Sequence, residues 1–143
     1  MKRSIVALLA MMAATQAYAA GGGSPKINYM LHCSGCHGPT GAGNPEVGIP
    51  DMRGAIGHFL RAKHGREFLI QVPGTSQTSM NDADVAVMMN WMLKQFSAAE
   101  VPAGTLPYTE QEIKQLRADR LADVPGRRAA IISELKAQGI SIE

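Results

Sequence analysis

The stretch His32-Cys33-Ser34-Gly35-Cys36-His37, "HCSGCH", contains the only two cysteines of the chain. The two thiols are three positions apart, and an imidazole follows the second thiol directly. No other stretch of the 143 residues combines reactive side chains so closely. The chemistry of this motif, together with the segments on either side of it, therefore decides what kind of fold and function to expect.

Four uses of such a motif are worth comparing: a structural disulfide, a zinc site, a dithiol redox centre and covalent attachment of haem. A disulfide between Cys33 and Cys36 would close only a tiny loop, and zinc would need a fourth ligand. A thioredoxin-like dithiol follows a strand, whereas the residues before Cys33 predict a helix. C-x-x-C-H is the direct sequence signal for covalent haem attachment. In that use each thiol adds to one vinyl group, and His37 lies beneath the iron as proximal ligand.

The first 19 residues have the features of a secretory signal peptide. A positively charged start, "MKR", precedes an apolar run from about Ile5 to Ala14 that is too short to span a bilayer. Ala17 and Ala19 fit the small-residue pattern before a cleavage point. We therefore expect an exported protein, which in a Gram-negative cell means a periplasmic one. Export supports the haem interpretation because bacteria attach this haem outside the cytoplasm.

The remaining chain, about 124 residues, is long enough for one small domain with a core. Without the two cations of the signal peptide, basic and acidic residues balance, so the composition gives no indication of a nucleic-acid surface. No later segment approaches the length of a transmembrane helix, and we expect no membrane span after cleavage.

The periodicity of apolar residues predicts helices and no confident strand, so the expected fold class is all-α. Gly38 to Gly57 is rich in glycine and proline and predicts an ordered, irregular loop that wraps something. Pro73-Gly74 is expected to end the helical segment 58–72, and "TSQTSM" to form a polar loop. The expected helices are Pro25 to Cys33, one or two short ones within 58–72, about 82 to 96, about Glu110 to Leu121, and about Pro125 to Gln138.

Capping residues support these helices. Ser24 followed by Pro25 is typical of a helix start, and Asn81 or Asp82 can cap the helix that follows. Thr109 with a glutamate three positions later forms a capping-box signature. Gly139 is a natural residue for the end of the last helix.

The motif and its surroundings resemble the class I c-type cytochromes, small single-haem electron carriers of bacteria and mitochondria. The resemblance covers about 24–96, and its most specific part is "CSGCH" with a downstream methionine and an aromatic-bearing helix. It implies a small cytochrome c fold of short helices and loops around one covalent haem c with iron. The implied organisation is a signal peptide at 1–19, a haem-binding domain at 20–96, and a linker with a two-helix extension at 97–143, packed on the same domain.

The resemblance also implies roles for individual residues. Cys33 and Cys36 hold the haem, and His37 is the proximal ligand of the iron. Met80 is the distal ligand, because it closes a polar loop just before a capped helix, where this family places its ligand. The Pro50 carbonyl, with Pro39 and Pro45 as alternatives, accepts a hydrogen bond from the proximal imidazole, which orients that ring. Met52 forms part of the wall against the porphyrin.

Other side chains could compete for these roles. Of the six methionines after the signal peptide, Met30, Met88, Met89 and Met92 lie on predicted helices, where core packing is the usual use of methionine. His58 and His64 are the rival axial ligands, and surface positions are the ordinary outcome for both. The resemblance also suggests that Tyr29 and Trp91 meet where the first and last core helices cross. A basic set could bind haem propionates or an acidic partner, or form a solvated face: Arg53, Arg61, Lys63 and Arg66.

A haem iron with both axial positions occupied has no free site for a substrate, so we expect an electron carrier and not an enzyme. The expected donor is a periplasmic dehydrogenase, and the expected acceptor an oxidase or another cytochrome. Two alternatives remain: a cytochrome subunit of a multi-component dehydrogenase, and a haem enzyme or sensor with an open sixth site. The extension at 97–143 bears on the first alternative, because an ordinary carrier needs no such element.

Overall fold

The structure is a computed structural model, which describes residues 23–142 of the chain. The predicted signal peptide, residues 1–19, lies outside the described residues. Within 23–142 every regular element is a helix, and the only β-type pairing is an isolated bridge between Asn44 and Ile49. The prediction of an all-α fold is confirmed.

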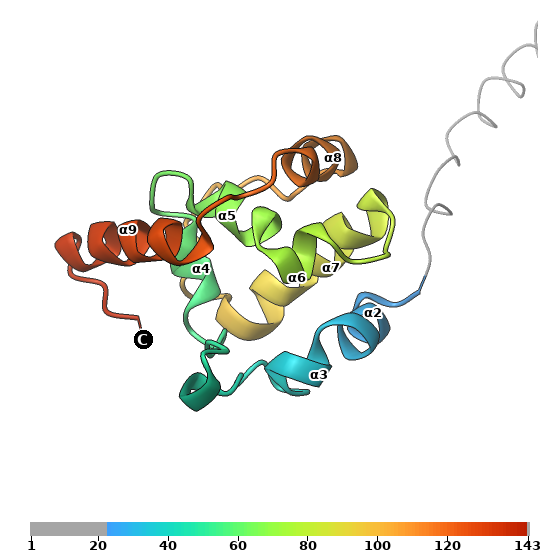
Figure 1. The fold of residues 1–143 in the computed structure, drawn as a ribbon, viewed down its shortest axis with the longest axis horizontal. Helices are drawn as coiled ribbons and strands as arrows, with labels where there is room; N and C mark the ends of the chain where they lie inside the picture. Colours follow the sequence, from blue (N-terminus) through green and yellow to red (C-terminus); the bar gives the residue numbers. More distant parts are fainter. Residues whose placement is uncertain (1–22, 143) are drawn as a thin grey trace, which may run out of the picture.

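Most of the helices are short, and they are joined by ordered connections (Figure 1). The longest is α7, which is surrounded by the others. In chain order the elements are α2 (Pro25–His32), α3 (Ser34–His37), the 3-10 helix η1 (Pro45–Val47), α4 (Ile56–Phe59), α5 (Gly65–Gln71), α6 (Pro73–Ser76), α7 (Asp82–Ser97), α8 (Glu110–Ala118) and α9 (Val124–Ala137).

Helices α2 and α7 pack against each other through an aromatic cluster. The Tyr29 ring of α2 lies 5.7 Å from that of Trp91 and 5.1 Å from that of Phe96, measured between centroids. Trp91 and Phe96 are themselves 5.6 Å apart with an edge-on geometry, which is a favourable arrangement for aromatic rings. The predicted contact of Tyr29 with Trp91 is confirmed, and it fixes the helix that leads into the cysteine motif.

Several predicted helix ends are confirmed by their caps. The Asn81 side chain accepts a hydrogen bond from the Asp84 N–H, and the Thr109 side chain accepts one from the Glu112 N–H. Gly139 has a φ of 80° just after α9, as expected of a glycine that ends a helix. Ser24, in contrast, makes no side-chain cap bond, although Pro25 does begin α2.

Three predicted boundaries are wrong. Helix α4 begins at Ile56, within the segment 38–57 that was expected to be an irregular loop. Pro73 was expected to end helical structure, but it begins the short helix α6, because proline fits the first turn of a helix, where no N–H is needed. The helix expected to run to Leu121 ends at Ala118, because the backbone of Asp119 leaves the helical region. The Asp119 carboxylate accepts a hydrogen bond from the Gln71 amide, 3.0 Å away.

The core is one apolar cluster that includes residues from both ends of the described chain. Helix α8 packs against α5 and α7, and α9 packs against α4 and α5 (Figure 1). Ile113 of α8, with Ile131 and Leu135 of α9, is almost completely buried in this cluster. The segment after Ser97 therefore contributes core side chains that are inaccessible to water.

A polar network fastens the connection between α7 and α8. The Tyr108 hydroxyl donates to the Arg66 carbonyl at 2.8 Å, and the Tyr108 backbone N–H donates to the Asn90 amide oxygen at 2.8 Å. The Arg66 guanidinium lies over the Tyr108 ring at 4.0 Å and forms two hydrogen bonds with Glu112, at 2.6 and 2.7 Å. The start of α8 is thus joined to α5 by charge-assisted bonds.

Candidate functional site

The cysteine motif begins at Cys33, where α2 meets α3, and its other residues form the single helical turn of α3. The Cys36 and His37 N–H groups both donate to the Cys33 carbonyl, at 3.2 and 3.0 Å. Side chains three and four positions apart share one side of a helical turn, so this backbone brings the two thiols and the imidazole to one face. Cys33 is half-buried, with its Sγ 3.9 Å from the Met88 Sδ, and Cys36 is exposed.

The structure bears on the competing uses of these thiols. Cys33 and Cys36 are both free, and the motif follows a helix where a thioredoxin-like centre would have a strand. Burial, and secondarily the nearby Cys36, raises the pKa of the Cys33 thiol, whereas a reactive redox cysteine has a lowered pKa. Among residues 23–142, no three His, Cys, Asp or Glu side chains are placed together to hold a metal ion.

His37 lies half-buried at the end of α3. Burial lowers its pKa, while the Pro50 backbone carbonyl acts in the opposite direction. The lowered pKa favours the neutral ring, which is the form that binds iron. Its Nδ1 atom is buried and has no geometrically complete hydrogen bond within the described residues. The Pro50 carbonyl is thus a close neighbour of the ring in this structure and not a fully formed acceptor.

Close backbone approach shapes the loop that follows the motif. The Gly43 N–H donates to the His37 carbonyl at 2.9 Å, and the Met52 N–H donates to the Gly41 carbonyl at 2.8 Å. Gly43 has a φ of 65°, and a Cβ there would collide with the carbonyls of Ile49 and Pro50. Glycine at this position is what allows the segment with Pro50 to lie against the segment that carries the imidazole.

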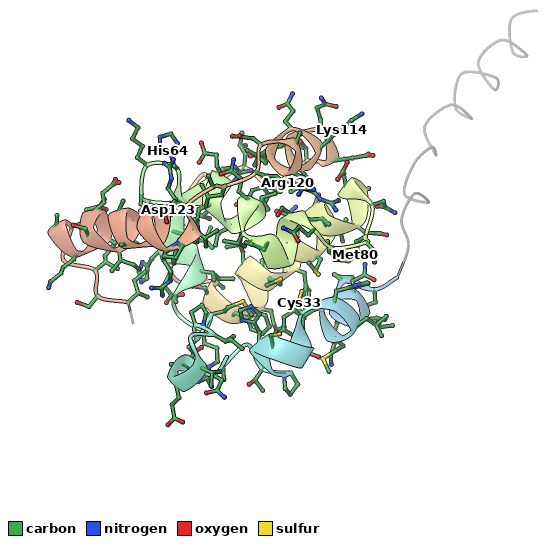
Figure 2. All side chains as sticks on the ribbon, in the orientation of Figure 1. Cys33, His64, Met80, Lys114, Arg120 and Asp123 are labelled. Carbon is green, nitrogen blue, oxygen red and sulfur yellow. The ribbon has the colours of Figure 1, made fainter. Side chains whose placement is uncertain are left out.

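Met80 and Met52 are both buried, with 8% and 5% of their surface exposed, and both belong to the central apolar cluster against which Cys33 packs. Met80 lies on the loop between α6 and α7, and Cys33 at the junction of α2 and α3 (Figure 2). Met88, Met89 and Met92 are buried core residues, as the sequence indicated. Met30 is 42% exposed, so its assignment to the core was wrong.

The rival histidines differ in their surroundings. His64 is exposed, has a left-handed φ of 62°, and its Nδ1 lies 3.8 Å from the Glu67 carboxylate. His58 on α4 is half-buried, and its Nδ1 is buried without a hydrogen-bond partner among the described residues. The expectation that both histidines lie at the surface therefore fits His64 better than His58.

The basic set predicted from the sequence is largely engaged within the protein. Arg53 pairs with Asp51 at 2.6 Å, and Arg61 donates to the Glu100 carbonyl at 3.0 Å. Arg66 is half-buried against Glu112, as described above. These cations therefore do not form a uniform solvated face, and Arg66 serves to join α5 to α8.

The role of Arg117, which lies close to Met80 in the structure, was not predicted from the sequence. Arg117, in the last turn of α8, donates from Nη1 to the Met80 carbonyl at 2.9 Å and to Asp82 at 2.7 Å. It also donates from Nη2 to the Thr78 carbonyl at 2.6 Å and from Nε to the Ser76 carbonyl at 3.1 Å. No local pattern could reveal these bonds, because they join residues 35 to 41 positions apart in the chain.

Comparisons with known proteins agree with this site. No protein-family model matches the chain. Two proteins named cytochrome c-552, both from Thermus thermophilus, are similar to it. The first is 28% identical over 139 residues, which is 85% of this chain and 90% of the relative. The second is 29% identical over 107 residues, which is 62% of this chain and 81% of the relative.

This similarity supports a c-type cytochrome, and the cofactor of such a protein is covalently bound haem c with iron. The residues present fit that cofactor: two free thiols and a half-buried imidazole share one helical turn beside a methionine-rich apolar core. Within residues 23–142, no helix is both long enough and apolar enough to cross a bilayer.

Proposed function

We propose that this chain is a periplasmic one-electron carrier with one haem c, whose iron is ligated by His37 and Met80. The observation that carries the proposal is the single helical turn on which two free thiols and a half-buried imidazole lie together. The similarity to two cytochromes c-552 over most of the chain supports the same conclusion.

The bound haem would supply a ferric/ferrous couple of one electron. Cys33 and Cys36 would hold it through thioether bonds, so their sulfurs take no part in redox chemistry. The loop tied by Gly43 brings the Pro50 carbonyl toward the His37 ring, and a full hydrogen bond there would orient the ring and raise its basicity. Buried Met52 and its neighbours would exclude water from the cofactor.

A methionine thioether as the second ligand favours the reduced state and thus raises the reduction potential. Met80 suits this role because it lies on a loop and not within a helix, while its side chain is buried in the core. With both axial positions taken, the protein would transfer electrons and perform no catalysis on a substrate.

Electron transfer to another protein requires one edge of the cofactor near the surface. Cys36 is exposed, which supports a docking surface on the side of the thioether bonds. We propose a periplasmic dehydrogenase as donor and an oxidase or another cytochrome as acceptor. A periplasmic location would follow from cleavage of the predicted signal peptide at residues 1–19.

The near-infrared absorption of the ferric holoprotein tests the ligation. We expect the weak band of a methionine sulfur on ferric iron in the wild-type protein and its loss in Met80→Ala. Two matched controls, Met52→Leu and His58→Ala, should keep the band, because neither would remove an iron ligand. A wild-type protein without the band, or a band that persists in Met80→Ala and is lost in Met52→Leu, would overturn the assignment of Met80.

A further inference from the structure

Arg117 forms hydrogen bonds with both ends of the Met80 loop, residues 76–82. Ser76 is the last residue of α6 and Asp82 is the first residue of α7, and the guanidinium bonds to both. Between them it bonds to the carbonyls of Thr78 and of Met80 itself. Four hydrogen bonds from one side chain thus span the whole loop from 76 to 82.

The loop has few other polar restraints of its own. Within it, the Met80 N–H lies 3.5 Å from the Thr78 hydroxyl, which is a long and weak hydrogen bond. The Asn81 cap belongs to α7 and holds the start of that helix. The three carbonyls bonded by Arg117 are therefore fixed mainly from outside the loop, by the extension that follows Ser97.

Arg117 differs from an ordinary surface cation. Its side chain is only 17% exposed and that of Asp82 only 26%, so their pair is partly shielded from water. The planar guanidinium can satisfy several acceptors at fixed angles, which the single ammonium group of a lysine cannot do. Gln71 and Asp119 hold the end of α8 against α5, so Arg117 projects from an anchored helix.

We propose that Arg117 is a positioning residue that holds the Met80 loop closed and so keeps the methionine sulfur on the iron. The inference rests on the proposed ligation by Met80 and goes beyond it, because it assigns control of the distal ligand to the C-terminal extension. Loss of the four bonds would let the loop open more often. Loss of the positive charge would also lower the reduction potential, because a nearby cation favours the reduced state.

Competition by imidazole measures how often the loop opens. In the ferric holoprotein, added imidazole can reach the iron only when Met80 leaves it. We expect Arg117→Gln to increase the apparent affinity for imidazole by roughly 10- to 100-fold, since several charge-assisted bonds are lost. Deuterium exchange should also become faster in the amides of 77–82. The near-infrared sulfur band should weaken at imidazole concentrations that leave the wild type unaffected.

Two further variants separate loss of the Arg117 hydrogen bonds from general destabilisation of α8 and from loss of the positive charge. Glu112→Gln, on the same helix, weakens the link of α8 to α5 without touching the Met80 loop and should change imidazole affinity by less than about threefold. Arg117→Lys keeps the charge but not the fork of donors, so it should preserve most of the potential and still bind imidazole more tightly than the wild type.

The outcomes distinguish this inference from the proposed function. If the wild type lacks the sulfur band, the ligation by Met80 is wrong. If the wild type has the band, but Arg117→Gln and Arg117→Lys bind imidazole and exchange deuterium no more readily than Glu112→Gln, then Arg117 serves only general stability and the inference is overturned. Arg117→Lys keeps the test decisive even if Arg117→Gln does not fold.

Discussion

The loop at 38–55 and the extension at 98–142 are both long connections to the same core, but they are held in different ways. The loop is held by backbone hydrogen bonds between nearby positions, with glycine where two backbones meet. The extension is held by side chains that reach across 18 to 71 positions of sequence. The stability of the loop therefore depends on which residues can adopt its backbone conformation. The stability of the extension depends on the functional groups of particular side chains.

The largest effect should come from a methyl group at Gly43. Gly43→Ala would combine a strained left-handed backbone with collision against two carbonyls, and we expect a loss of about 4 kcal/mol in unfolding free energy. Gly48→Ala is the matched control, because Gly48 also has a positive φ but open space around its Cα. It should lose only about 1 kcal/mol in a urea titration. If the two variants lost equal unfolding free energy, the close contact of the Gly43 backbone with the Ile49 and Pro50 carbonyls would be unimportant for stability.

A smaller effect is expected in the extension, from removal of one hydroxyl. Tyr108→Phe would remove the hydrogen bond from the buried Tyr108 hydroxyl to the Arg66 carbonyl, which should lower the unfolding free energy by about 1 to 2 kcal/mol. Burial raises the pKa of Tyr108 well above its ordinary value of 10.0. The folded state therefore favours the neutral phenol, and this contribution is full below pH 10 and is lost as the pH rises further.

The pH dependence gives the Tyr108 prediction a second measurement. Chemical unfolding at pH 8 and at pH 11 should show the wild type losing stability more steeply than Tyr108→Phe, so that the difference between them narrows. A difference that stays constant between these two pH values would mean that the hydroxyl is not held in the neutral form.

The smallest effect is expected at the surface of the loop. Arg53→Gln removes a pair with Asp51 in which both side chains are well exposed, at 55% and 36%. Exposed ion pairs contribute little to stability, so the thermal midpoint should stay within the error of the measurement. A clear fall in the midpoint would show that side-chain pairing also matters in the loop, which would weaken the contrast with the extension.

The same contrast explains what the sequence could and could not predict. The caps of Asn81 and Thr109 and the glycine after α9 depend on residues within one turn, so local patterns predicted them correctly. The glycine-rich loop was predicted for the same reason. Exposure of Met30 was not expected, because it depends on how α2 crosses α7 through Tyr29, with Trp91 and Phe96 on the partner helix.

The site divides in the same way. The thiols and imidazole form one contiguous motif, and they could be found from it directly. The four acceptors of Arg117 are set by the packing of α8 against α7 and α5, which no spacing in the sequence reveals. The short helix α6 was missed because a proline was taken as a stop signal, although it serves equally well as the first residue of a helix.

The position of Arg117 near the end of the chain also implies an order of events during maturation. In the export that we propose from the signal peptide predicted at residues 1–19, the cysteines at 33 and 36 would cross the membrane well before residue 117. The Met80 loop would then not yet be bonded to Arg117. The cofactor could therefore enter between this loop and the cysteine motif. Packing of α8 would then close that entrance, so that a segment delivered after the cysteines would complete the proposed coordination of the iron by Met80.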